Sequence, residues 1–218
     1  MNIQDAIQRV KKKEPLFTSI VMQLEPVKTD TIPTLGTDGE KLLYNQKFID
    51  TLTPDEASAV VLHEVLHCVF QHVWRRGKRE KFRFNLACDY AINTIVNESF
   101  VLPKGSLLDM KYYGLSAETI YNMLPPTKKI QVWCDKGGWK DGKKKGQKGL
   151  VGKIKQALSG DKEKTEAEQS AIEAKWKRLF EKNILKQYGK MPESIRRVVE
   201  KEYYVPVIDW SSLVQNLL

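Results

Sequence analysis

The chain has 218 residues, of which 41% are hydrophobic and 29% are charged, and its net charge is +9. This composition is typical of a globular protein with one sizeable domain, and it excludes a membrane-spanning helix, because no stretch approaches the roughly 20 apolar residues that one needs. Since residues 1–14 are polar and lack an apolar signal core, we expect a cytoplasmic protein.

The first elements predicted along the chain are a basic helix at residues 3–13 and a strand at residues 17–24. Asp38-Gly39 then separates two short extended runs, at residues 32–37 and 41–44. Because Asp-Gly between two such runs is a strong turn signal, we expect a β-hairpin here.

The best-marked helix begins after Thr53. Thr53-Pro54-Asp55-Glu56 matches a capping box with proline at the first helical position. Apolar residues then fall on nearly all sides of the helix as far as Val73, which predicts that it is buried. Gly77 is the predicted stop.

Four further segments follow. A second buried helix is predicted from Asn85, as its N-cap, to Val96. A short helix begins at Ser116, and two more helices are predicted at residues 166–187 and 192–203.

The intervening residues 127–165 have a different composition. They contain twelve Lys, no Arg and only four acidic residues, and so hold most of the excess positive charge. We therefore divide the chain into a core at residues 1–126, a flexible Lys/Gly-rich segment at 127–165 and a helical part at 166–218 that packs on the core. Nucleic acid is not an expected partner, because sequence readout by proteins usually brings Arg and aromatic residues together.

The motif that carries chemistry is His63-Glu64-Val65-Leu66-His67, which matches H-E-x-x-H. Residues four apart on a helix point about 40° from each other, so both imidazoles can reach one ion. The pattern predicts a Zn²⁺ site in which Glu64 is the general base and acid for hydrolysis of a peptide bond.

A third protein ligand is required. His72 would point about 140° away from His67 on a continuous helix, so we interpret it as structural or at the surface. Asp89 is the preferred ligand because an unpaired aspartate inside an apolar helix is costly, and Asn93, one turn later, could orient it from outside the metal's own ligands. Glu98 and Asp109 are the alternatives.

The three cysteines do not suggest a second metal site. Cys68, Cys88 and Cys134 are far apart in sequence and form no C-x-x-C pair, so a thiolate zinc site of the usual spacing is not expected. Reduced, buried thiols are the simpler interpretation.

Taken together, several segments resemble one family, the metallopeptidase domain commonly found N-terminal to a von Willebrand factor A-like domain in bacterial and phage proteins. The segments that carry the resemblance are Thr37-Asp38-Gly39 with Tyr44-Asn45 and Phe48, Leu52-Thr53-Pro54-Asp55-Glu56, His63-Glu64-Val65-Leu66-His67, Ala87-Cys88-Asp89-Tyr90-Ala91-Ile92-Asn93, Pro103-Lys104-Gly105 and Ala117-Glu118-Thr119-Ile120-Tyr121.

The resemblance implies an α+β, zincin-like fold with a small sheet or hairpin beside the buried H-E-x-x-H helix and a mostly helical C-terminal part. It supports Asp89 as the third ligand and Glu64 as the catalytic residue. A peptide or protein substrate and a von Willebrand factor A-like partner are the expected partners. The alternative function is a non-catalytic, metal-stabilised binding or scaffold protein, and no substrate-binding residue can be named.

Overall fold

The computed structural model describes residues 1–126 and 165–202, and the fold of these parts is mixed α+β. The elements are α1 (Ile3–Lys13), η1 (Pro15–Phe17), α2 (Thr18–Val21), β1 (Glu25–Lys28), β2 (Leu35–Thr37), β3 (Lys41–Tyr44), α3 (Gln46–Ile49), α4 (Pro54–Val69), α5 (Lys81–Ser99), η2 (Met110–Tyr112), α6 (Ala117–Met123), α9 (Glu166–Leu179), η3 (Phe180–Ile184), η4 (Leu185–Lys190) and α10 (Glu193–Glu202). Most of the predicted flexible segment at 127–165, the end of the predicted helical part at 166–218 and Cys134 lie outside the described residues.

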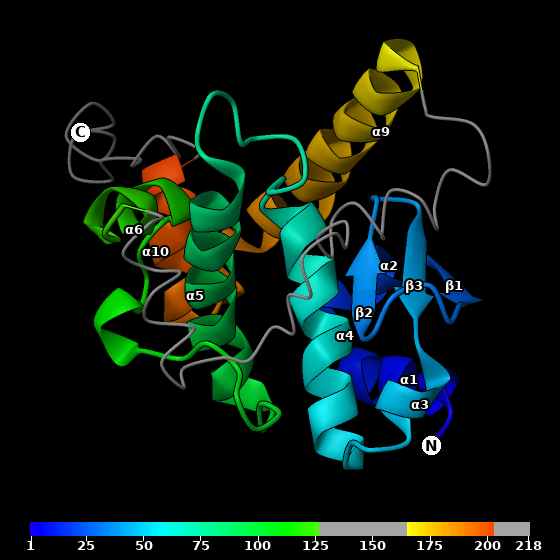
Figure 1. The fold of residues 1–218 in the computed structure, drawn as a ribbon. Helices are drawn as coiled ribbons and strands as arrows, with labels where there is room; N and C mark the ends of the chain where they lie inside the picture. The colour runs from blue at the N-terminus through cyan, green and yellow to red at the C-terminus, as the bar shows by residue number, and fades with distance from the viewer. Residues whose placement is uncertain (127–164, 203–218) are drawn as a thin grey trace, which may run out of the picture.

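α4 occupies the centre of the molecule. The three-stranded sheet lies on one side of it and α5 lies on the other (Figure 1). The helix begins as predicted, because the Thr53 side chain and the Glu56 carboxylate bond each other's backbone N–H groups. Its side chains are largely buried, and both neighbouring layers pack against them.

The sheet has the order β1-β3-β2, with β1 parallel and β2 antiparallel to β3. The predicted hairpin is therefore confirmed as β2 and β3. Gly39 in its turn has φ +89°, and a Cβ there would lie 2.7 Å from the Trp74 ring, so only glycine fits. The Trp176 indole, buried on α9, donates to the Gly39 carbonyl over 2.7 Å and fixes α9 against this turn.

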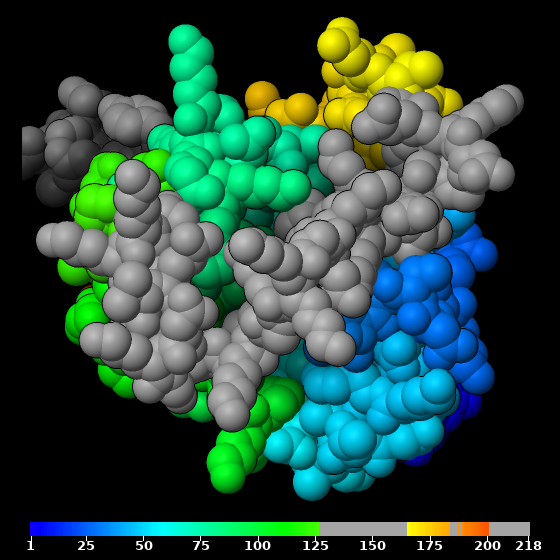
Figure 2. Space-filling model, in the orientation of Figure 1, coloured from blue at the N-terminus to red at the C-terminus, as the bar shows by residue number. Residues whose placement is uncertain are grey.

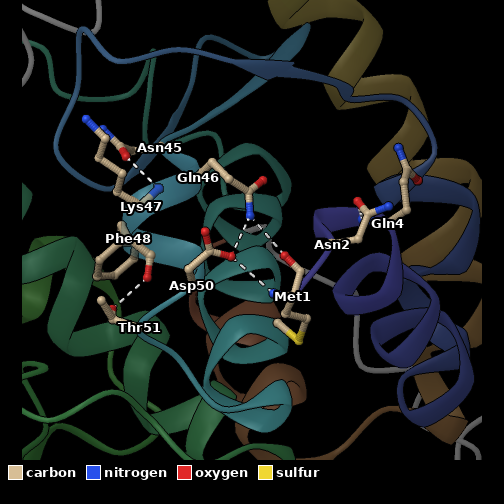
Figure 3. Close-up of polar contacts among 9 residues, drawn as sticks. All are labelled: Met1, Asn2, Gln4, Asn45, Gln46, Lys47, Phe48, Asp50 and Thr51. Atoms are coloured by element: carbon tan, nitrogen blue, oxygen red, sulfur yellow. Dashed lines mark hydrogen bonds and ion pairs between the residues drawn. The ribbon is translucent and has the colours of Figure 1, made fainter.

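The N-terminus is also tied into the fold. Asn2 caps α1, while the Met1 ammonium lies 3.1 Å from an Asp50 carboxylate oxygen (Figure 3). The Gln46 amide donates to both the Met1 carbonyl and Asp50. Its hydrogen bond to Asp50, together with the Met1 ammonium, lowers the pKa of that carboxyl group. α1 and α3 are thereby joined by polar contacts at one end.

The predicted strand at residues 17–24 is wrong, because this segment forms the helical turns η1 and α2. Phe17, Ile20, Val21 and Leu24 are all buried, and their spacing is that of one helix face. The β-branched and aromatic composition favoured a strand, whereas the spacing of the buried side chains is helical.

The ends of three helices differ from the prediction. α4 ends at Val69 rather than near Gly77. α5 begins at Lys81 instead of after Asn85, because the Glu80 carboxylate accepts from two backbone N–H groups of its first turn. The helix predicted at 166–187 is α-helical only to Leu179 and continues as π-helical and 3₁₀ turns. Among the described residues, no helix is both long and apolar enough to cross a membrane.

Candidate metal centre

Two imidazoles face each other on α4. His63 and His67 lie four residues apart, and their ring centroids are 4.7 Å apart. Their Nε2 atoms are separated by 3.0 Å. The helical spacing thus brings one nitrogen of each ring to the same point, as the motif predicts.

Asp89 reaches this point from α5. Its Oδ1 lies 3.3 Å from His67 Nε2 and 3.6 Å from His63 Nε2. The three side chains are 13–19% exposed, so the cluster is mostly but not completely enclosed. Among the described residues, these three form the one group of His, Cys, Asp or Glu side chains that could hold a metal ion.

The charges of the cluster reinforce one another. Burial raises the pKa of Asp89, but its hydrogen bonds to the two imidazoles outweigh that effect and lower it. Burial likewise opposes the charged form of His63, yet the hydrogen bond and negative charge of Asp89, with a contribution from Glu64, raise the pKa of His63 to about 9. The cluster therefore favours positive charge at this point.

Asn93 fixes the hydrogen-bonding state of His63. Its Nδ2 donates to the Leu107 carbonyl over 2.9 Å, and a carbonyl can only accept. The amide oxygen must then face His63 Nδ1, which lies 2.8 Å away and donates to it. In the neutral ring, Nε2 consequently has a free lone pair directed at His67 and Asp89.

The role predicted for Asn93 was to orient Asp89, and the contact instead goes to His63. The Asn85 amide, one turn before Asp89, donates to Asp89 Oδ2 over 3.3 Å. Sequence spacing showed that Asn93 shares a face of α5 with Asp89, but it did not show which residue of α4 packs opposite that face.

Other predicted residues lie around or away from the cluster. Glu64 is partly exposed on the same turn of α4 as His63. Glu98 is exposed and lies near Tyr113, where burial and the hydrogen bond with Glu98 raise the pKa of the tyrosine. Asp109 forms an ion pair with Lys111 over 2.7 Å. Neither alternative ligand lies in the three-residue group.

The two described cysteines are buried and are not part of the metal group. Cys68 and Cys88 are free thiols, as the sequence interpretation expected of both. Burial raises the pKa of the Cys68 thiol, which keeps it neutral, so it behaves as a small core residue.

His72 is the residue near the cluster that sequence reasoning missed. Because α4 stops at Val69 and Gln71 adopts φ +56°, the chain turns back and brings the His72 ring to 5.4 Å from that of His67. His72 is only 6% exposed. The sequence analysis left open whether His72 is structural or at the surface, and its prediction that His72 points away from His67 is wrong, because the helix does not continue to His72.

The family described as a putative metallopeptidase domain matches residues 1–218. The searches of curated proteins and of solved structures found no match.

Proposed function

This chain belongs to that metallopeptidase-domain family, and from this premise we propose that it is a zinc-dependent hydrolase of peptide bonds. The observation that carries the proposal is the convergence of His63, His67 and Asp89 from two helices onto one point. In this proposal these three side chains bind the metal, and Glu64 accepts a proton from the attacking water.

The donor set suits zinc. Two imidazole nitrogens and one carboxylate oxygen are common zinc ligands, and catalytic sites keep three protein ligands with a fourth position open. Two ligand atoms that each lie roughly 2.0–2.1 Å from a tetrahedral ion are about 3.3 Å apart. The separations of 3.0, 3.3 and 3.6 Å among the three atoms bracket this value.

A bound zinc ion would lower the pKa of a coordinated water toward about 7 and would polarise the carbonyl group of a substrate. Glu64 is adjacent to His63 on α4 and partly exposed, so its carboxylate can take a proton from solvent in the site. The same carboxyl group then returns that proton to the leaving amine. In the neutral His63 ring, the hydrogen bond to Asn93 places the hydrogen on Nδ1 and leaves Nε2 free for the metal.

The arrangement around α4 also supports a zincin-like fold. The motif lies on a buried helix, and a small sheet lies beside that helix with β2 as an edge strand (Figure 1). A peptide or protein substrate follows from the proposed reaction. A von Willebrand factor A-like domain is a proposed partner on the ground of the sequence resemblance alone.

The proposal is tested by metal content and proteolysis in parallel. Elemental analysis of the purified protein should find about one zinc per chain, and fluorescein-labelled casein should be cleaved by wild type and not by Glu64→Gln. Glu98→Gln, which neutralises an exposed carboxylate outside the cluster, is the matched control and should retain activity. A wild-type protein that holds no zinc after zinc is supplied at neutral pH refutes the proposal.

The alternative function is a metal-stabilised binding or scaffold protein. One observation favours a structural role for the metal: the ligands come from α4 and α5, so a bound ion would link two neighbouring helices. Zinc retained at one per chain, with no cleavage of casein or of a mixed peptide library by wild type, would favour this alternative.

A further inference from the structure

The two imidazoles of the metal group are held in different ways. His63 Nδ1 donates to Asn93, which is itself fixed by the Leu107 carbonyl. The polar contacts of His67 with other described residues, His63 and Asp89, are both made by its Nε2 atom. Among the described residues, no hydrogen bond to its Nδ1 atom orients the ring. Metal-binding histidines are almost always oriented through their second nitrogen, so His67 needs another means of orientation.

The His72 ring occupies the position next to His67. The rings meet edge to face, with an interplanar angle of 75°. The backbone N–H of His72 also donates to the His67 carbonyl over 2.9 Å, which closes the turn and fixes the spacing of the two residues. The two contacts tie His72 to both the backbone and the ring of His67.

His72 is itself held from its other sides. Its ring centroid lies 5.9 Å from that of Phe70 and 6.4 Å from that of Phe84, a buried residue near the start of α5. A ring enclosed in this way has little freedom to rotate, because close-packed side chains stay near one rotamer. His72 can therefore restrict the ring that it contacts.

Two local costs accompany this arrangement. Gln71 adopts a left-handed backbone conformation, which is unfavourable for a residue with a side chain. His72 Nδ1 is buried without a hydrogen-bond partner among the described residues. Costs of this kind at adjacent positions are typical of functional sites, where the surrounding structure enforces them.

We propose that His72 is a positioning residue for the metal site: its buried ring, packed against His67, orients His67 as Asn93 orients His63. The inference rests on the proposed metal-binding function and adds a residue outside the H-E-x-x-H motif and its third ligand. It assigns the role to the flat ring of His72 and not to a bond from its nitrogens.

The test measures zinc affinity by competition with a chromophoric chelator, together with the visible absorption of bound Co²⁺, which responds to ligand geometry. His72→Ala and His72→Leu should each lower zinc affinity about 10- to 100-fold, as loss of an orienting group does. Both should also shift the Co²⁺ bands. His72→Phe keeps a flat ring and should bind zinc within about threefold of wild type.

Two reference variants separate positioning from general destabilisation. Asn93→Ala removes the hydrogen bond to His63 and should lower affinity by a similar factor. Phe17→Leu alters a fully buried core residue on η1, so it should lower the unfolding midpoint but leave zinc affinity and the Co²⁺ bands unchanged.

The outcomes are distinct. If wild type binds zinc and His72→Leu binds it equally well with an unchanged Co²⁺ spectrum, the positioning role is refuted and the proposed function stands. Loss of affinity in His72→Phe equal to that in His72→Leu refutes the role assigned to the ring. Absence of zinc from wild type refutes the proposed function and this inference with it.

Discussion

The affinity for zinc should depend steeply on pH, because a proton and the metal compete for His63. Asp89, 3.6 Å from His63 Nε2, and the nearby charge of Glu64 raise the pKa of the metal-free ring to about 9, although burial opposes this. A metal ligand must be unprotonated. At pH 7 only about 1% of metal-free molecules have a neutral His63, which weakens apparent zinc binding about 100-fold relative to pH above 9.

The slope follows from one proton. Affinity should rise about tenfold per pH unit between roughly pH 6 and pH 8, and about one proton should be released for each zinc bound. Isothermal titration in buffers of different ionisation enthalpy measures the released protons directly. An affinity that stays flat over this range, with no buffer-dependent heat, would show that His63 is neutral in the metal-free site or does not bind the metal.

Asp89→Asn is the matched variant. Without the carboxylate, burial is left as the main influence on the pKa of His63, and it acts in the lowering direction. The variant should bind zinc more weakly at every pH, and its affinity should change little between about pH 7 and pH 8. A slope equal to that of wild type would remove Asp89 as the cause of the shift.

The metal-free protein should show the opposite trend in stability. The pKa of His63 is raised in the folded state, from 6.5 to about 9. Its stabilising contribution is therefore fully present below pH 6.5 and is lost as pH rises through about 9. Thermal unfolding with a chelator present measures this, and a stability that increases over that interval would contradict the assignment.

Three further predictions concern the framework of the site. Asp55→Ala removes the acceptor of the Val101 N–H, whose hydrogen bond is the main cause of the lowered pKa of Asp55. The substitution should lower the free energy of unfolding by about 1 kcal/mol at pH 7. The difference from wild type in thermal unfolding should shrink as pH falls below about 4. Trp176→Phe leaves the buried Gly39 carbonyl without its donor and should lower stability by about 1–3 kcal/mol, measured as the urea midpoint, whereas an unchanged midpoint would mean that the hydrogen bond is dispensable. Gln71→Gly relieves the left-handed conformation and should raise stability by roughly 1 kcal/mol, and a loss instead would show that the glutamine side chain stabilises the turn.

The start of α4 and the facing pair of histidines could be predicted because both depend on residues close in sequence. Thr53 and Glu56 form the capping box, and the spacing of His63 and His67 suffices to bring two rings together. The hairpin likewise follows from a local signal, since the Asp38-Gly39 turn has the residue that its backbone requires.

The remainder depends on packing between elements. The partner of Asn93 is decided by how α5 lies against α4 and by the loop that carries Leu107, and neither is encoded in the spacing along α5. The direction of His72 depends on the end of α4, where Gln71 adopts a conformation that local propensity disfavours. A tertiary fold that outweighs a local preference cannot be foreseen from the residues at that position alone.

The hydrogen bond from Asn93 to the Leu107 carbonyl means that a loop outside the metal group influences the tautomer of His63. If that carbonyl moved away, the amide would be free to turn over and present its NH₂ group to His63 Nδ1. The neutral ring would then accept at Nδ1 and carry its hydrogen on Nε2, which a cation would have to displace before it could bind. A backbone oxygen 14 residues beyond Asn93 in sequence thus favours the tautomer of His63 that a metal can bind.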